Sequence, residues 1–332
     1  MALRFIDGFD NYQSVGGVLT GADIPNIGYT FDVPAAGYAV VAQGTSALSK
    51  CVALLRTTGG AATMAKQFNT TGANKVVIGF AMNANARDTI MEVTNVFTTE
   101  WLSTGYPKIN SVTGTVIPIL NTWYYYEFVI NKTAQTVDLW LNGFKQFTAP
   151  ITNPVPDVLE FVWGWTSGAG ASNATVKIDD MYFVDDIDPT SKYRDRIGPM
   201  EVVTRFPTGN GTNAWAPTPS TKQNWQIVSQ VPANTLEFVQ SNTIGAVDTY
   251  VSNTAVTGEV IAVAVSTLAA KADVDNHSIT VLMEQSGVQK ESGNIPLNLQ
   301  YTFSQGVFEK DVNGVDWTAE TVNASRFGMK VK

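Results

Sequence analysis

Two glutamates in predicted β-strands are the first residues to consider for catalysis. Glycoside-cleaving enzymes place two carboxyl groups beside a sugar bond, one as general acid and the other as nucleophile or base. Glu127 lies in the aromatic run TWYYYEFVIN, where the residues two positions away are Tyr125 and Val129, so it has no acidic neighbour on its strand face. Glu160 in VLEFVW likewise has no acidic neighbour on its strand face. We expect packing, or hydrogen bonding at a solvated face, for both glutamates, and no enzyme activity.

The single histidine and the single cysteine, His277 and Cys51, offer little else for catalysis. A serine–histidine–aspartate site could be built around one histidine. However, His277 lies in the polar segment DVDNHSIT, and the chain has no Gly-x-Ser-x-Gly signature. We expect His277 to be a surface turn residue and Cys51, in the apolar run KCVALLR, to be a buried, inert thiol. With one histidine and one cysteine, the chain has too few of the usual zinc ligands for a typical zinc site.

Acidic residues gather at the end of the first half, where calcium could find oxygen ligands. The segment VKIDDMYFVDDID supplies five carboxylates: Asp179, Asp180, Asp185, Asp186 and Asp188. If this segment is a strand, Asp179 and Asp180 point to opposite faces, so one site cannot easily use both. We therefore expect no metal and no cofactor. Asp179, Asp185 and Asp186 are the candidates for calcium, and the alternative is a strand end followed by an acidic, solvated linker.

Three tryptophans are candidates for contact with a sugar or a protein partner. Trp163 and Trp165 share one face of a predicted strand, and Trp215 lies in a loop-rich segment. Their rings could stack on sugar rings, although aromatic residues of a β-sandwich more often fill its core. The glycine-rich residues 209–211 lack the Lys-Ser/Thr pair of a phosphate-binding loop, and we expect a flexible loop there.

These residues have to be positioned by short strands. Runs rich in Val, Ile, Thr and aromatic residues, separated by Gly, Asn, Pro and Thr, predict an all-β chain. Alternation along residues 122–131 places Trp123 and Glu127 on one face of a strand. The next strand, residues 136–143, carries Leu139 on its apolar face and ends in Asn-Gly, a strong hairpin turn. We expect Trp123 and Leu139 to be core residues.

Further strands are expected at residues 75–82, 89–96, 158–163, 176–184, 246–252, 258–267, 277–285, 300–309 and 326–331. Two segments stay open. ALSKCVALLR (residues 47–56) fits either a helix or a buried strand, and EVIAVAVSTLAAKAD (residues 259–273) could begin as a strand and end as a short helix.

A concentration of charge and proline, DDIDPTSKYRDRIGP, separates the two halves of the chain. We place a domain boundary there, with a first domain at 1–190 and a second, β-rich domain at 191–332. Both halves show similar strand spacing, which predicts two β-sandwich domains rather than one large barrel.

The composition argues against several classes of function. The 332 residues carry 21 Lys and Arg against 29 Asp and Glu, a net charge of −8, whereas a broad nucleic-acid contact needs a basic face. No apolar run approaches the roughly 18 residues that span a bilayer, and MALRFIDGFDNYQ does not fit a signal peptide. One cysteine cannot form an internal disulfide, which fits folding in a reducing cytoplasm.

Three segments of the first half, TWYYYEFVIN, TVDLWLNG and VKIDDMYFVDD, carry a known pattern. It resembles the concanavalin A-like, laminin-G-like jelly roll, in which a Trp begins one strand, the next ends in a tight Asn/Asp-Gly turn, and a late strand carries an Asp-Asp pair. Trp123, Asn142, Gly143, Asp179 and Asp180 match these places. The resemblance implies a jelly roll for the first domain but no particular function, because the fold serves lectins, glycanases and structural modules. The Glu-x-Asp-x-x-Glu motif of its glycanases is absent.

A second resemblance spans most of the chain. FIDGFDNY, the stretch from IGPMEVVTRFPTGNGTNAWAP to VDTYVSN, and the C-terminal YTFSQGVFEKDVNGVDWTAETVNASRFGMKV are similar to virion, minor tail or tail-fibre proteins of bacteriophages. This implies a structural component of a phage virion, on the tail or as a capsid decoration, assembled in the host cytoplasm. Its partners would be other virion proteins and copies of itself. The alternative is a phage adhesin that binds host surface glycan, and the third hypothesis is a glycan hydrolase.

Overall fold

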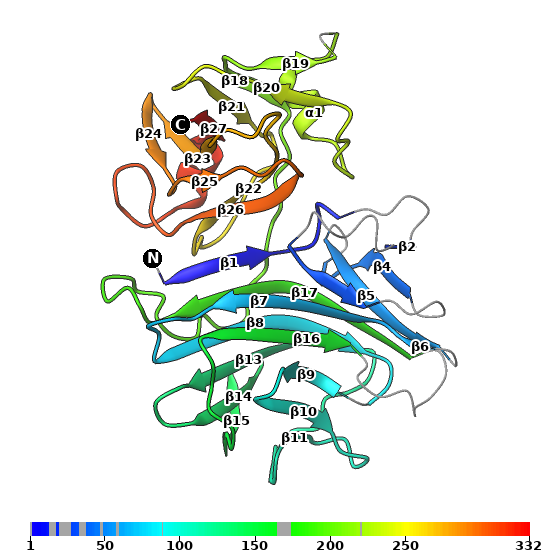
Figure 1. The fold of residues 1–332 in the computed structure, drawn as a ribbon. Helices are drawn as coiled ribbons and strands as arrows, with labels where there is room; N and C mark the ends of the chain where they lie inside the picture. Colours follow the sequence, from blue (N-terminus) through cyan, green and yellow to red (C-terminus); the bar gives the residue numbers. More distant parts are fainter. Residues whose placement is uncertain are drawn as a thin grey trace. The chain divides into compact units, whose positions relative to one another are not determined.

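The computed structural model describes residues 2–12, 18–19, 28–32, 38–46, 49–57, 60–87, 89–164, 174–219 and 221–332. Their regular secondary structure is almost entirely β-strand, with two short helices, α1 (Asn224–Val228) and α2 (Ala319–Ala324), which confirms the predicted all-β class (Figure 1). The chain forms two compact units: 1–25 with 29–202, and 26–28 with 203–332. Residues 191–202 therefore group with the first unit. Within the described residues, no helix is long and apolar enough to cross a membrane.

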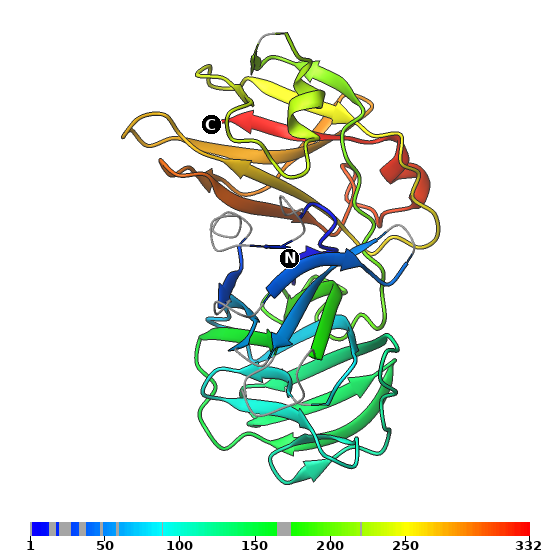
Figure 2. The ribbon, with the colours of Figure 1, turned by 90° about the vertical axis from the view of Figure 1, so that its right-hand side faces the viewer.

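Two antiparallel sheets form the first unit and lie face to face as the layers of a jelly-roll β-sandwich (Figures 1 and 2). The larger sheet has, in the described residues, the order β15 (Phe144–Pro150), β14 (Thr136–Leu141), β13 (Tyr124–Asn131), β8 (Lys75–Ala84), β17 (Ala174–Asp185), β5 (Lys50–Thr57), β4 (Tyr38–Gln43) and β2 (Val18–Leu19), with β1 (Leu3–Asp7) paired to β17 and β6 (Gly60–Ala61) paired to β5. The smaller sheet has the order β12 (Val112–Thr113), β11 (Pro107–Ile109), β10 (Phe97–Trp101), β9 (Thr89–Val93), β16 (Val158–Gly164), β7 (Thr63–Asn69) and β3 (Thr30–Asp32).

Aromatic side chains from both sheets fill the core between them. Phe80 on β8 meets the fully buried Trp163 on β16 edge to face, with 5.7 Å between ring centroids. Phe183 on β17 stacks on Phe68 on β7 at 4.0 Å. Leu139 on β14 is 0% exposed, which confirms its predicted core position. Burial of these large rings supplies the main driving force for joining the sheets.

The alternation predicted for β13 holds, with one exception at its start. Tyr126 and Phe128 stack on Phe80 inside the sandwich, while Glu127 points to the other face. The prediction that Trp123 is a core residue is wrong, because it is only half-buried. It precedes the first paired residue, Tyr124, so the sheet does not hold its side chain against the opposite layer.

The two segments left open are both settled as strands. ALSKCVALLR contains β5, in which Cys51 is fully buried and its thiol donates to the carbonyl oxygen of Gln43 at 3.2 Å. Burial raises the pKa of the Cys51 thiol to about 12, as expected for an inert cysteine. EVIAVAVSTLAAKAD contains only β22 (Val263–Ala269) and no helix follows it. The expected loop at 209–211 is wrong, because these residues belong to β18 (Gly209–Asn213), which pairs with β21 (Val247–Val251).

The second unit is built on one larger sheet and two strand pairs. Its larger sheet runs, in the described residues, β18, β21, β27 (Arg326–Val331), β23 (Ser278–Gln285) and β24 (Val288–Glu291), with β25 (Ile295–Pro296) paired to β23. The strand pairs are β19 (Ala216–Thr218) with β20 (Phe238–Gln240), and β22 with β26 (Thr302–Phe308). The core between these layers and α2 consists of Val281, Met283, Phe308, Trp317 and Val322.

The core position of Leu139 predicts a large loss of stability on truncation. Leu139→Ala should lower the free energy of unfolding by about 2–5 kcal/mol, because it removes buried methyl groups and leaves a cavity. Val158→Ala is the control, since Val158 is half-exposed on β16, and its cost should stay below about 0.5 kcal/mol. Urea unfolding of both variants measures the difference, and equal costs would contradict the assignment of this core face.

Candidate functional site

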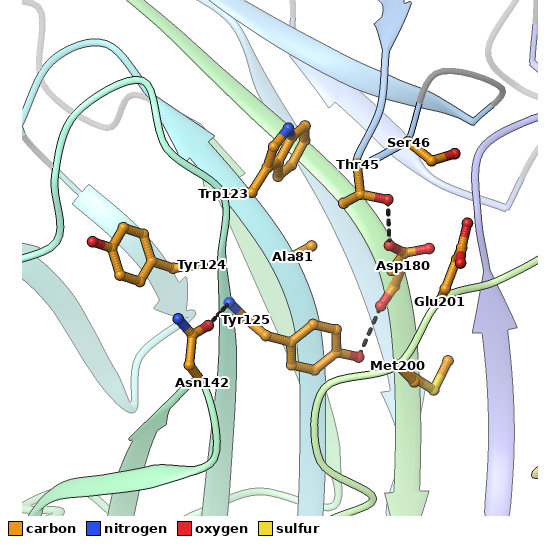
Figure 3. Close-up of a pocket in the computed structure, with 10 residues that line it drawn as sticks. All are labelled: Thr45, Ser46, Ala81, Trp123, Tyr124, Tyr125, Asn142, Asp180, Met200 and Glu201. Carbon is orange, nitrogen blue, oxygen red and sulfur yellow. Dashed lines mark hydrogen bonds between the residues drawn. The ribbon is translucent and has the colours of Figure 1, made fainter.

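A pocket of about 310 Å3 opens on the first unit beside the start of β13 (Figure 3). It lies near the lower end of the sizes seen for small-molecule sites and is open to solvent. Its lining comes from β13, its neighbours in the sheet, the turn after β4 and the segment after β17: Thr45, Ser46, Ala81, Trp123, Tyr124, Tyr125, Asn142, Asp180, Met200 and Glu201.

Hydrogen bonds at the start of β13 fix the Tyr125 side of the pocket. The turn between β14 and β15 has Asn142 and Gly143 at φ 48° and 82°, as the predicted hairpin requires. This conformation lets Asn142 Oδ1 accept from the Tyr125 amide at 2.7 Å. The Tyr125 hydroxyl donates to the Asp180 carbonyl oxygen at 2.9 Å, as Figure 3 shows. The half-buried ring of Trp123 lies on the same side of the pocket as Thr45.

A β-bulge in β17 brings two neighbouring aspartates to the same loop. The pairing of β17 with β8 shifts register between Asp179 and Tyr182, and Asp180 has a left-handed backbone with φ 49°. The Thr45 amide donates to Asp179 Oδ2 and the Thr45 hydroxyl to Asp180 Oδ2, both at 2.8 Å. The prediction that Asp179 and Asp180 face opposite ways is therefore wrong, because the bulge breaks the two-residue alternation.

Both carboxylates of the bulge are buried and supplied with donors. The Val202 amide donates to Asp180 Oδ1 at 2.8 Å, and the Asp180 amide to Asp179 Oδ1 at 2.8 Å. Burial, with the nearby charge of Asp180, raises the pKa of Asp179 to about 7. Burial is also the main cause that raises the pKa of Asp180 to about 6, and the charge of Glu201 adds to it. N–H and O–H donors occupy these oxygens, so the carboxylates tie loops together and do not fit a calcium site.

The other calcium candidates lie elsewhere on the same strand. Asp185 is buried at the end of β17, 3.3 Å from the Arg4 guanidinium. Asp186 Oδ1 accepts from the amides of Asn74 and Lys75 at 2.9 and 3.1 Å. The structure does not bring Asp179, Asp185 and Asp186 together, because Asp179 lies in the middle of β17, Asp185 is its last residue and Asp186 follows it.

One exposed group of acidic residues and a histidine lies in the second unit. Among the described residues, only Asp273, Asp275 and His277 place three potential metal-ligand atoms within 4.8 Å of one another. His277 Nε2 is 2.8 Å from Asp273 Oδ1, and all three side chains are exposed, which confirms the prediction of a surface turn.

The three predicted contact tryptophans do not form a common surface. Trp163 is fully buried against Phe80 and Phe161, so its proposed role in glycan or partner contact is wrong. Trp215 is half-buried in the second unit, where its indole N–H donates to the Ala246 carbonyl oxygen at 3.2 Å. Trp165 lies outside the described residues.

Glu127 is a buried ion-pair residue and not a residue of a solvated face. Its carboxylate accepts from the Tyr182 hydroxyl at 2.6 Å, the Arg196 guanidinium at 2.8 Å and the Gly198 amide at 2.8 Å, and the side chain is 0% exposed. Tyr182 in turn lies over Gly79, where a Cβ atom would come within 2.1 Å of its ring. Of the two expectations for Glu127, packing is confirmed, and hydrogen bonding at a solvated face is wrong.

Glu160 lies on the other sheet, in β16, and is half-buried. It accepts hydrogen bonds from the Gln67 side-chain amide at 3.0 Å and from the Thr94 hydroxyl at 2.9 Å. Glu127 and Glu160 therefore do not form the carboxylate pair that glycoside cleavage needs.

The segment after β17, residues 191–202, is fastened along the first unit at several points. Asp195 pairs with Lys75 at 2.6 Å. The Arg196 guanidinium lies 3.5 Å from the centre of the Trp140 ring while it pairs with Glu127. These contacts lead the chain to Val202 and place Met200 and Glu201 at the pocket.

The sequence did not single out the pocket as a site. The sequence pattern marks Trp123 and Asn142 for the fold, and Asp180 for the fold and as one of five clustered carboxylates, and it gives no signal for Glu201. The position of Trp123 is the signal that could have located the pocket. Trp123 precedes the first paired residue of β13, so the strand does not direct its side chain into the core.

The buried aspartates predict a first unit that is less stable at higher pH. A carboxyl group whose pKa is raised in the folded state stabilises the fold at low pH, and this contribution is lost as pH rises through the folded pKa. The free energy of unfolding should therefore fall between pH 5 and pH 8. Asp180→Asn should reduce that fall by about 1 kcal/mol, because the amide carries no charge; its oxygen can still accept from the Val202 amide, and its NH2 group can donate to the Thr45 hydroxyl. Urea unfolding at both pH values measures this, with the exposed Asp32→Asn as control, and an unchanged fall in Asp180→Asn would refute the assignment.

Two fragments test the role of residues 191–202. Fragment 1–202 should fold cooperatively, because a sandwich of this size buries its own core. Fragment 1–190 lacks the donors of Arg196 and Gly198, so Glu127 loses its ion pair and keeps only the Tyr182 hydroxyl as a donor. The free energy of unfolding of this fragment should therefore be lower by about 3–5 kcal/mol. Urea melts compare the two, and Arg196→Ala in fragment 1–202 should reproduce much of the loss. Equal midpoints for the two fragments would show that the segment adds nothing to the first unit.

No family model and no curated protein matches this chain. Among solved structures, the chain is similar to a sialidase (11% identity, TM-score 0.42, 55% of this chain and 18% of the sialidase). It is also similar to the cellulose induced protein Cip1 (13%, 0.41, 55% and 97%) and to domain 4 of AbnA, a GH43 extracellular arabinanase from Geobacillus stearothermophilus in complex with arabinotriose (12%, 0.39, 55% and 92%). With TM-scores below 0.5, these similarities carry no conclusion about what this chain does.

Proposed function

We propose that the first unit is a non-enzymatic carbohydrate-binding module that takes a sugar ring in the pocket beside Trp123. The observation that supports this most directly is the half-exposed indole of Trp123 beside hydrogen-bonding groups that line the same pocket. A sugar ring has an apolar face of C–H groups and an edge of hydroxyl groups. It therefore suits a pocket with one aromatic wall and polar groups around it.

The polar groups of the pocket are fixed before a ligand arrives. Asn142 Oδ1 is held by the Tyr125 amide, which leaves its Nδ2 group on the outer side of the turn as a donor. The Thr45 hydroxyl donates to Asp180 Oδ2 at 2.8 Å, and its position is set in this way. A rigid set of donors and acceptors costs little ordering on binding, which favours recognition of a weakly binding sugar.

The chain as a whole would serve a bacteriophage as an adhesin or accessory protein of the virion. This part of the proposal is supported by the sequence resemblance to virion and tail proteins. The module would then attach the particle to glycan on the host surface.

A second candidate function is a purely structural contact in the virion, and it too has an observation in its favour. In the described residues, β15 is an edge strand of the larger sheet, and its first residue, Phe144, is 74% exposed. Ile119, in the loop that precedes β13, is 66% exposed. Edge strands with exposed apolar side chains are suited to pairing with another chain. If this is the function, Phe144→Asp should abolish self-association in sedimentation experiments while Trp123→Ala leaves it unchanged.

Trp123→Ala tests the carbohydrate site. The variant should bind host surface polysaccharide at least about tenfold more weakly in calorimetric titrations, because the aromatic platform is lost. Tyr106→Ala, a half-buried aromatic of the same unit outside the pocket, should bind like the unchanged protein. Thermal melts check that both variants are folded. Equal affinity of Trp123→Ala and the unchanged protein would remove the pocket from consideration, and release of oligosaccharides during incubation would show that the protein is an enzyme.

A further inference from the structure

The charge of the residues that line the pocket indicates which class of sugar it can bind. This inference rests on the proposed carbohydrate-binding function. The ten lining residues include two carboxylates, Asp180 and Glu201, and no lysine, arginine or histidine. A uronic or sialic acid placed there would bring a third carboxylate close to these two without a cation to balance it. Like charges at short range are unfavourable, so acidic sugars are disfavoured.

Glu201 is the group that can act on a ligand directly. It is exposed, and within the described residues its carboxylate has neither a hydrogen bond nor an ion pair. Figure 3 shows this carboxylate beside Asp180 and across the pocket from Trp123. A cation that enters the pocket would find a free partner there.

Asp180, in the buried part of the pocket lining, adds to the negative potential in the pocket. Its side chain is 2% exposed and fixed by the Val202 amide and the Thr45 hydroxyl. The charge of Glu201 adds to the effect of burial in raising the pKa of Asp180, as expected for neighbouring carboxylates. A positive group between them would relieve this repulsion.

The indole of Trp123 gives the pocket an aromatic face that suits a positively charged sugar. Indole is the best of the aromatic side chains for attracting a positive charge to its face, and the same face packs against the C–H groups of a sugar. A sugar that carries a protonated amine satisfies both requirements at once: its ring contacts Trp123 and its ammonium group reaches Glu201.

We infer that the pocket selects amine-bearing sugars, so that its ligand class is a glycan with N-deacetylated hexosamine units. Neutral N-acetylated hexosamines would bind more weakly, because the acetamide removes the positive charge. Acidic glycans would be excluded.

Three tetrasaccharides of equal length test this by calorimetry at pH 6 on the full chain: a glucosamine tetramer, its N-acetylated counterpart and a galacturonate tetramer. The glucosamine tetramer should bind about tenfold more tightly than the acetylated one, and the galacturonate tetramer should not bind. Glu201→Gln should abolish the preference for the amine and leave binding of the acetylated tetramer unchanged. Trp123→Ala should abolish binding of both.

Glu100→Gln is the matched control, because Glu100 is an exposed glutamate of the same unit outside the pocket. If Glu100→Gln and Glu201→Gln weaken the glucosamine tetramer equally, the attraction is a general one to an acidic protein and the inference fails. Equal binding of the amine and acetylated tetramers, both lost in Trp123→Ala, would refute the amine selectivity while the proposed carbohydrate site stands. No binding of any of the three sugars, together with no binding of host polysaccharide, would refute the proposed function itself.

Discussion

Anions buried on a sheet face need donors, and in the first unit the chain after β17 provides them. Glu127 and Asp180 are almost completely buried, and their partners include Arg196, Gly198 and Val202. A buried carboxylate without its donors costs several kcal/mol. Detaching this segment would remove such donors, so the cost of exposing that loss stabilises the attached segment in addition to the segment's own contacts. Its path also determines where Met200 and Glu201 lie. The same hydrogen bonds that pair the buried carboxylates therefore also position the residues of the pocket.

The strands of the chain could be predicted largely from local pattern, because burial on a pleated sheet imposes a two-residue period on the sequence. The hairpin at Asn142-Gly143 and the buried position of Leu139 follow from this period and from turn chemistry. The bulge at Asp180 does not, because the partner of both aspartates is Thr45, which lies far away in the sequence and donates to each of them. A single sequence does not show that these two places meet.

The tryptophans show why residue type alone does not locate a site. Trp163 and Trp123 are chemically identical, yet one is in the core and the other lines a pocket. Their positions in the strands separate them: Trp163 is within β16 on the face that meets the other sheet, whereas Trp123 precedes the first pair of β13. Glu127 shows the same limit for charge, since an isolated glutamate in an aromatic strand gave no indication that Arg196 would reach it.

Cys51 has a practical consequence for placing this protein within a larger assembly. It is the only cysteine of the chain, its side chain is fully buried, and its thiol is protonated across the neutral range. Thiol-directed reagents need an accessible thiolate and will leave Cys51 unmodified. A cysteine introduced at an exposed position such as Val158 would then be the single reactive thiol of the chain. A gold cluster or fluorophore attached there would mark every copy at one defined point, without removal of any native residue from the core.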